Sequence, residues 1–347
     1  MERRTLSKHC LPAFLEALGE RRRVVAPRRL PTGDIVFAEY AGGGDVPLDY
    51  VNSLLPPKDL FFPRREVLFT IEGSRRPVLS APPTEKPLAV FGIRSCDVTG
   101  LTFLRKFFGE RGFVDDSVIR RIDDALILSL ACTTPGPDCF CVCCEGGPFL
   151  TSGFDLQMVD IGDDALLVEV GSARGQALVD EHGALFRPVD EALVAAKRRA
   201  VEHVDATFER RSYIAAGIKR ISLGRVPPET WERLAADCQG CGGCCHVCPT
   251  CSCFTVDDVP TGDQTWQRER TWDSCLYSGF TREASGHNPR EPRAERVKRR
   301  FFHKMSFQYI ERMGRHGCVG CGRCVTTCMG CLDISTLLER ITQDAAE

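Results

Sequence analysis

The sequence predicts an α/β or α+β domain at the N-terminus, followed by a mostly helical domain at the C-terminus. Short apolar runs bounded by Gly, Pro and polar residues lie in the first half of the chain, which is typical of strands. From about residue 190 onward, apolar positions recur at helical spacing. Cysteines gather in three groups, one after the predicted strands and two in the helical part. We therefore expect an α/β domain at 1–190, a helical connector at 191–227 and a cysteine-bearing helical domain at 228–347.

The N-terminal domain begins with a basic, mildly helical segment and continues with four predicted strands. Leu11, Leu15 and Leu18 recur at helical spacing near the start of the chain. The strands are apolar runs between turn residues, at 67–71, 88–93, 125–130 and 165–170. A helix is expected at 98–108, between the second and third strands. The sequence does not predict the order of the strands in the sheet.

The connector and the C-terminal domain are predicted to be helical throughout. An apolar stripe predicts one connecting helix from residue 190 to about 221; its members are Leu193, Ala196, Ala200 and Val204. Pro227 and Pro228 favour a second helix at 229–237, since proline is common in the first turn of a helix. The long segment between Cys253 and Cys318 also has a helical pattern.

The composition is ordinary apart from its cysteines. The chain has 347 residues, of which 43% are hydrophobic and 27% are charged, and its net charge of −2 gives no indication of nucleic-acid binding. No apolar run reaches the roughly 18 residues of a transmembrane helix, and no signal-peptide core is visible, so we expect a cytoplasmic protein. Twenty cysteines are present. In a reducing compartment so many thiols are more often metal ligands than disulfides.

Two cysteine motifs share the spacing C-x2-C-x2-C-x3-C. The first contains Cys238, Cys241, Cys244 and Cys248, and the second contains Cys318, Cys321, Cys324 and Cys328. This spacing is typical of paired [4Fe–4S] clusters, in which the fourth cysteine of each motif ligates the other cluster. The predicted ligands are therefore Cys238, Cys241, Cys244 and Cys328 for cluster 1, and Cys318, Cys321, Cys324 and Cys248 for cluster 2. The C-terminal domain is thus predicted to be a helical ferredoxin-like domain with two [4Fe–4S] clusters.

These motifs allow two alternative interpretations. Cys245, Cys248 and Cys251 also follow the x2 spacing, but Thr255 stands where a fourth cysteine is needed. Paired C-x2-C units also form four-cysteine zinc sites, so a zinc-stabilised interaction module is the alternative of another class. Two complete four-cysteine motifs favour iron–sulfur clusters over zinc.

An upstream group of cysteines predicts a third [4Fe–4S] cluster. Cys96 and Cys132 each follow a predicted strand, and Cys139 and Cys141 come shortly after. The ends of neighbouring strands meet at one edge of a sheet, so these four thiols could converge there. The alternative is that some of them are buried as small apolar side chains. The sequence assigns no role to two further thiols of this group, Cys143 and Cys144.

The remaining candidates are weaker. Cys251, Cys253 and Cys275 are only three thiols, which favours packing around the clusters over an additional metal site. His246, His287 and His303 are expected to be structural. The basic stretch at 282–304 is expected to be mostly a solvated helix face, with partner docking or a charge effect on the clusters as the alternative.

The sequence contains no motif for substrate chemistry. No dinucleotide-binding fingerprint, P-loop, nucleophile elbow or zinc-protease motif is present, and no catalytic residue is predicted. These observations favour an electron-transfer subunit whose catalysis belongs to other chains. A self-contained reductase, with an open coordination position on a cluster of the N-terminal domain, is the alternative.

Most of the chain resembles the β-type iron–sulfur subunit of soluble NAD(P)-linked [NiFe] hydrogenases (sulfhydrogenases), and equally the type-A subunit of anaerobic sulfite reductases. The resemblance rests on FGIRSCD at 91–97, CFC at 139–141, GFDL at 153–156, CPTCSCF at 248–254, WDSC at 272–275, ASGHNPR at 284–290, HK at 303–304 and CVGCGRC at 318–324. Together these segments are far more specific than a single C-x2-C pair.

The resemblance implies an electron relay in a complex of several subunits. A flavoprotein subunit that contains FAD and reacts with NAD(P)H would lie on one side, and a catalytic subunit, of hydrogenase type or alternatively of sulfite-reductase type, on the other. One departure from the family pattern is Met329, which follows Cys328 where proline is usual. Cys331 is an extra thiol near this position, and Cys143, Cys144 and Cys245 are extra thiols elsewhere.

Overall fold

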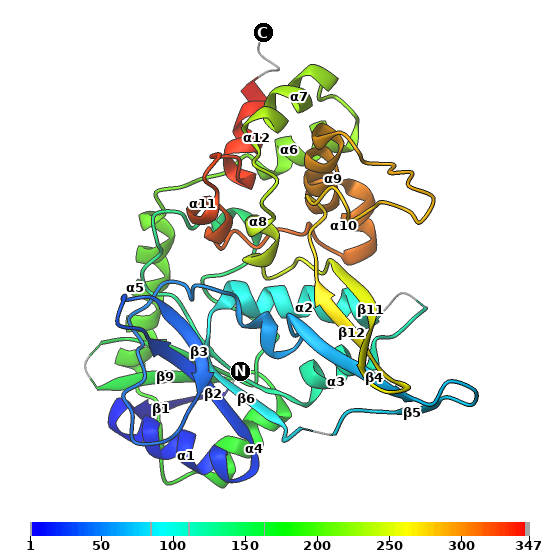
Figure 1. The fold of residues 1–347 in the computed structure, drawn as a ribbon. Coiled ribbons are helices and arrows are strands. Elements are labelled where there is room, and N and C mark those ends of the chain that lie inside the picture. Colours follow the sequence, from blue (N-terminus) through cyan, green and yellow to red (C-terminus); the bar gives the residue numbers. More distant parts are fainter. Residues whose placement is uncertain (1, 84, 110–111, 163, 344–347) are drawn as a thin grey trace.

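The fold comes from a computed structural model of the chain, which describes residues 2–83, 85–109, 112–162 and 164–343. A large sheet with helices on both faces lies at one end of the molecule, and a group of helices lies at the other (Figure 1). The cysteine-bearing loops run between these two parts. A smaller sheet projects from the side of the molecule (Figure 1).

Within the described residues, eight strands form one mixed sheet in the order β10-β1-β9-β8-β7-β6-β2-β3. In that order they span Phe186–Pro188, Arg3–Ser7, Ala165–Val170, Leu156–Asp160, Leu126–Leu130, Leu88–Ile93, Arg23–Arg29 and Ile35–Glu39. Strands β2, β6, β7 and β8 are parallel, and the outer strands join antiparallel. Every residue of β6 and β7 is buried, as expected for parallel strands covered on both faces.

Helices cover both faces of this sheet. On one face lie α1 (Leu11–Arg21) and α4 (Ala173–Glu181), and on the other lie α2 (Ser95–Gly109) and α3 (Asp116–Asp124). The three leucines expected on a helical face at the start of the chain are all buried in α1. Helix α2 contains the helix predicted at 98–108 and lies between the sheet and the cysteine-bearing loops (Figure 1). The mixed α/β character predicted from the sequence is therefore confirmed.

The smaller sheet corrects the helical expectation for part of the segment between Cys253 and Cys318. Residues 254–272 form two strands, β11 (Phe254–Gly262) and β12 (Thr265–Trp272), not a helix. They pair with β4 (Arg65–Glu72) and β5 (Val78–Ser80) in the order β11-β12-β4-β5. Charged residues of this segment are neutralised across the sheet, because Arg270 of β12 donates to Glu66 of β4. The strand predicted at 67–71 thus belongs to this smaller sheet.

The connector consists of two helices where one was predicted. Helix α5 (Glu191–Thr207) begins at Asp190, whose side chain accepts a hydrogen bond from the Leu193 amide, and α6 (Ile214–Ser222) follows after a break. Of the expected apolar stripe only Val204 is buried. The other three positions are half-buried, so α5 lies on the surface of the molecule.

The helical part at the C-terminal end surrounds the two cysteine motifs. It contains α7 (Pro228–Asp237), α9 (Arg293–Met305), α10 (Phe307–Met313) and α12 (Ile334–Gln343), which share a core with α6. Two short helices carry motif cysteines, α8 (Gly243–His246) and α11 (Arg323–Thr327), and both lie on the side of this part that faces α2 (Figure 1). Short 3₁₀ helices occur at Lys8–Cys10, Pro57–Leu60 and Cys141–Cys144. No helix in the described ranges combines the length and apolarity that crossing a membrane requires.

Candidate iron–sulfur centres

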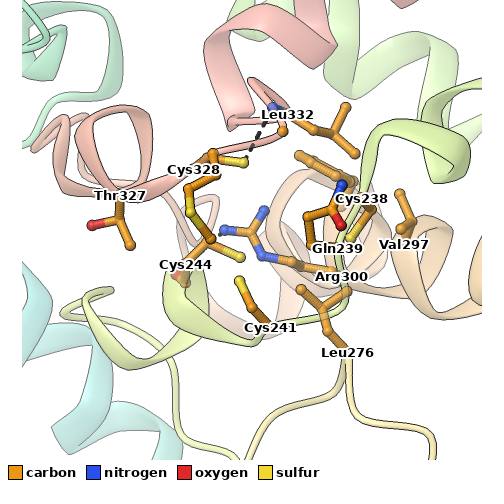
Figure 2. A pocket seen from close by; sticks show the side chains of 13 residues that line it. Cys238, Gln239, Cys241, Cys244, Leu276, Val297, Arg300, Thr327, Cys328 and Leu332 are labelled. Carbon is orange, nitrogen blue, oxygen red and sulfur yellow. Dashed lines mark hydrogen bonds between the residues drawn. The ribbon is translucent and has the colours of Figure 1, made fainter.

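The four cysteines predicted to bind cluster 1 line a single cavity. Cys238 ends α7, Cys241 and Cys244 belong to the loop and helix that follow, and Cys328 ends α11. We call these four residues the outer set. Apolar side chains complete the wall of the cavity, among them Leu276, Val297, Phe301 and Leu332 (Figure 2). Cys241 is exposed whereas Cys244 is buried, so this cavity lies near the surface.

Both cysteine motifs fold into the same backbone loop. Gly240 and Gly242 of the first motif have φ angles of +67° and +73°, and Gly320 and Gly322 of the second have φ angles of +65° and +77°. These left-handed turns suit glycine and start a short helix in each motif. The amides of Gly240 and Gly320 each lie 3.4 Å from the sulfur of the first cysteine of their motif. Such N–H donors stabilise a thiolate, the form of cysteine that binds iron.

The four cysteines predicted to bind cluster 2 also come together; we call them the middle set. The thiol of Cys324 interacts electrostatically with those of Cys318 and Cys248, and the thiol of Cys321 interacts with that of Cys248. Burial raises the pKa of Cys324 to about 12 and raises the pKa of Cys321 as well. Without a metal Cys321 and Cys324 therefore hold protons, which binding of a metal cluster would release.

The upstream cysteines converge as the strand-end argument predicted. Strands β6 and β7 are parallel neighbours, and Cys96 and Cys132 follow their carboxyl ends. The thiol of Cys132 interacts electrostatically with those of Cys96, Cys139 and Cys141. We call these four residues the inner set. Burial raises the pKa of each of these thiols, that of Cys139 to about 11.

The three sets form a continuous series through the molecule. Cys244 of the outer set interacts electrostatically with Cys324 of the middle set. Cys321 of the middle set interacts in the same way with Cys96 and Cys141 of the inner set. Gly320 shows how closely the last two sets pack, since a Cβ atom placed there would lie 2.5 Å from Cys141 Cα.

Two polar side chains lie where the middle and inner sets meet. Asn52 Nδ2 donates to the Cys321 carbonyl oxygen at 2.6 Å and lies 3.9 Å from Cys139 Sγ. Arg323 forms a buried bidentate ion pair with Asp97, with N–O distances of 2.6 and 2.8 Å. The sequence had not indicated either Asn52 or this ion pair. These contacts fix the loop of the second motif against the N-terminal domain.

Three buried cations face the cysteine sets without a carboxylate partner. Lys58, Arg300 and Lys304 are 3–4% exposed, and none of them takes part in the ion pairs found among the described residues. Nε and Nη1 of Arg300 have no hydrogen-bond partner within that part of the chain. Burial alone would lower the pKa of Lys304, but the nearby Cys248 and Cys251 thiolates outweigh it and the pKa is raised. Buried charges without counter-ions are strongly destabilising.

This charge arrangement fits thiolate-ligated [4Fe–4S] clusters. Four thiolates around a cubane give it a net negative charge, and that charge would balance Arg300 and Lys304. It also changes the interpretation of the basic stretch at 282–304, which was expected to be mostly solvated. Arg296, Arg300 and Lys304 of α9 are buried, while Arg293 and Lys298 are exposed as expected.

The geometry offers little support for the zinc alternative. A four-cysteine zinc site needs all its sulfurs about 2.3 Å from one point. In the described part of the chain, no group of three or more His, Cys, Asp or Glu side chains is placed to hold a single metal ion. The outer set lines a cavity without its sulfurs meeting at a point, which suits a larger group such as a cubane.

The other candidates from the sequence lie at the edges of these sets. Cys144 hydrogen-bonds to Cys318 and lowers its pKa, and Cys143 lies beside Cys144. Cys331 is exposed just beyond the outer set and has a φ angle of +49°. The three histidines contact other groups: His246 Nε2 lies 3.2 Å from Tyr277 Oη, the His303 ring packs on Tyr309, and the His287 carbonyl accepts from the Glu283 amide.

Comparison with known proteins gives two findings. Residues 237–332 match the family model of the 4Fe-4S dicluster domain, so the C-terminal part of the chain contains such a domain. The chain is also similar to Sulfhydrogenase 2 subunit beta of Pyrococcus furiosus, with 30% identity over 339 residues that cover 97% of this chain and 98% of that protein. The similarity therefore extends over all three cysteine sets.

Proposed function

Because this chain belongs to the family of sulfhydrogenase beta subunits, we propose that it is the electron-transfer subunit of a hydrogenase-type oxidoreductase complex. The observation that best supports this proposal is the series of three four-cysteine sets, from the surface near Cys241 to the carboxyl edge of the large sheet. A passage for electrons needs such a series, whereas a zinc-stabilised interaction module does not.

We assign one [4Fe–4S] cluster to each set, with the twelve cysteines as ligands. When bound, such clusters accept and donate single electrons. The chain itself supplies the thiolates and the apolar wall around the outer set. It also supplies the buried cations, which stabilise the more negative, reduced state of a nearby cluster. The relative is named as one subunit of a sulfhydrogenase, so we place the catalytic step in another subunit.

We propose that residues 1–190 carry the inner set, that 191–227 form the connector, and that 228–347 form a helical ferredoxin-like domain with the outer and middle sets. The helices around the two motifs support this division. The strands at 254–272 are an addition to that domain, and they pair with β4.

The proposed partners are a flavoprotein subunit with FAD, which reacts with NAD(P)H, and a hydrogenase-type catalytic subunit. The relative carries the word sulfhydrogenase in its name, and subunit beta implies further subunits. Twenty unpaired thiols suit a reducing compartment, so we place the complex in the cytoplasm.

The test begins with anaerobic purification of the full chain and of its native complex. We expect a coloured iron–sulfur protein that bleaches with NAD(P)H only when the flavoprotein subunit is present. Replacing one inner ligand, Cys139→Ala, should remove about four irons per chain, since each cubane holds four. The control Cys10→Ala, at a half-buried cysteine outside the sets, should keep its iron.

Three results would contradict the proposal. A colourless protein that holds only zinc would support the interaction module. Reduction of a substrate by the isolated chain would support a self-contained reductase. Purification with a sulfite-reducing partner instead of a hydrogen-activating one would place the chain in an anaerobic sulfite reductase.

A further inference from the structure

Four thiols outside the three sets also come together, although the sequence favoured packing around the clusters for three of them and assigned no role to Cys245. They are Cys245 of α8, Cys251 and Cys253 in the loop before β11, and Cys275 after β12. The Sγ atoms of Cys245 and Cys275 are 3.9 Å apart. Side-chain interactions also join Cys245 to Cys251 and Cys253 to Cys275. We call these four residues the fourth set.

The hairpin of β11 and β12 builds this arrangement. Phe254 at the start of β11 pairs with Trp272 at the end of β12, and the Asp273 amide donates to the Cys253 carbonyl oxygen at 3.0 Å. The strand ladder therefore returns the chain so that Cys275 lies next to Cys253. The sequence counted only Cys251, Cys253 and Cys275 here, and the hairpin brings Cys275 next to a fourth thiol, Cys245. The register and the hydrogen bonds of the β11–β12 pair fix the contact between Cys253 and Cys275, so this contact does not depend on a flexible loop.

Positive charge also faces the fourth set. Lys58 Nζ donates to the Cys251 carbonyl oxygen at 2.9 Å and lies 4.1 Å from the centre of the Trp272 ring. Arg300, with two nitrogens that lack a partner among the described residues, interacts electrostatically with Cys245 and Cys251. Neutral thiols would leave these cations uncompensated in the interior, whereas an anionic group at this position would balance them.

The fourth set lies between two of the sets already described. Cys245 follows Cys244 of the outer set in the sequence, and the two thiols interact. Cys251 interacts directly with Cys248 of the middle set. A redox group held here would therefore adjoin both neighbouring centres.

We propose that Cys245, Cys251, Cys253 and Cys275 are the ligands of a fourth [4Fe–4S] cluster. Four soft thiolate donors are the ligand set of a cubane. Since Cys245 and Cys275 are in contact, their side chains must rotate apart when the cubane is assembled. The inference rests on the proposed function, which is electron transfer. Each electron that passes through this centre oxidises the cluster that it leaves and reduces the cluster that it enters.

The experiment compares the full wild-type chain with Cys253→Ala and Cys275→Ala after anaerobic reconstitution. We expect about sixteen irons and as many acid-labile sulfides in the wild-type chain, and about twelve in each variant, since each cubane holds four. The matched control Cys10→Ala should keep the wild-type iron content. Thermal unfolding of each apoprotein shows whether the alanine variants fold like the wild type.

A second measurement tests the proposal without any variant. Spin quantitation of the fully reduced wild-type chain, supported by Mössbauer spectra of iron-57 protein, should correspond to four clusters per chain. About twelve irons in the wild type, and the same number in both variants, would overturn the fourth centre while leaving the three-cluster relay intact. One zinc per chain, lost in Cys275→Ala, or a Cys245–Cys275 disulfide in the native protein, would overturn it too. Failure of the proposed function is a different result: a wild-type chain without iron.

Discussion

Lys304 illustrates how one side chain can influence a metal centre. Its ammonium lies 3.4 Å from Cys248 Sγ and also contacts Thr250 Oγ1, while the whole residue is 4% exposed. A fixed positive charge in a poorly solvated site stabilises the state of its neighbour with more negative charge. For an iron–sulfur cluster that is the reduced state, so Lys304 should raise the reduction potential of the middle centre.

Replacing Lys304 by methionine should lower that potential. The Lys304→Met side chain keeps much of the length of lysine but removes the charge, so the reduced cluster loses its nearest cation. We expect a fall on the order of tens of millivolts, measured by potentiometric titration followed by EPR.

Lys298→Met is the matched control, because it removes a lysine from the same helix. The Lys298 side chain is 49% exposed and pairs only with Glu295 at 3.8 Å. Its charge is screened by solvent, so the potential should stay at the wild-type value. Equal shifts in both variants would show that Lys304 acts through the total charge of the protein rather than through its position.

Glu169 predicts how stability depends on pH. It is 2% exposed on β9, and Lys197 of α5 donates to both of its carboxylate oxygens at 2.6 Å. Burial alone would raise the pKa of Glu169, but the hydrogen bonds from Lys197, Gln157 and Arg3 lower it below the ordinary 4.5. A carboxyl group with a lowered pKa contributes stability above pH 4.5, and this contribution is lost as the pH falls through the lowered value.

The variant Glu169→Gln should therefore be less stable than the wild type at neutral pH, by about 2 kcal/mol, because a charge-assisted pair is lost. The difference should shrink as the pH falls from 4.5 to the lowered pKa, because the carboxyl group takes up a proton first in the unfolded chain and then in the native protein. Chemical denaturation of the apoprotein at several pH values measures both. A difference that stays constant with pH would mean that Glu169 is protonated in the native protein.

At the scale of elements, the hairpin of β11 and β12 depends on a buried ion pair. Arg270 is 1% exposed, and its guanidinium donates to Glu66 of β4 and Asp115 at the start of α3. Removing it with Arg270→Met would leave the 9% exposed Glu66 with only Arg121 as a partner. We expect a loss of about 3 kcal/mol in the free energy of unfolding, measured by denaturant titration.

Arg268→Met provides the comparison on the same strand. Arg268 and Asp258 form a bidentate pair with distances of 2.8 and 2.7 Å, and both side chains are 41% exposed. Exposed pairs contribute little, so this variant should lose far less free energy of unfolding than Arg270→Met. If both variants lose the same free energy, the stabilisation of the hairpin does not come from the burial of Arg270.

These two arginines also show where prediction of elements from the sequence stops. Apolar runs identified β4, β6, β7 and β9, because short runs of hydrophobic residues are typical of strands. The segment Arg268–Glu269–Arg270 looks like solvated helix surface, and nothing local reveals that Glu66, far away in sequence, neutralises Arg270. Ion pairs between distant segments override local propensity, and only the folded chain contains them.

At the scale of the whole molecule, the sequence predicted which cysteines gather when a local rule applied. Motif spacing placed Cys328 with the first motif and Cys248 with the second, and the position of Cys96 and Cys132 after strand ends placed them near each other. The fourth set was not predicted, because Cys275 comes into contact with Cys245 only through the hairpin. The burial of Arg300 and Lys304 was not predicted because α9 has the composition of a surface helix.

The C-terminal part of the chain depends on the N-terminal part. Residues 228–347 contain the outer and middle sets, but the N-terminal part supplies Glu66 and Asp115 to Arg270, and Asp97 to Arg323. Without it, two buried guanidinium groups lose their counter-ions, and β12 loses the pairing with β4. We therefore expect the isolated fragment 228–347 to bind much less iron than the same fragment produced together with 1–227. Iron and sulfide analysis after identical anaerobic reconstitution measures the difference. A fragment that alone binds its full iron content and unfolds cooperatively would show that the ion pairs join two independent domains, rather than complete a single folding unit.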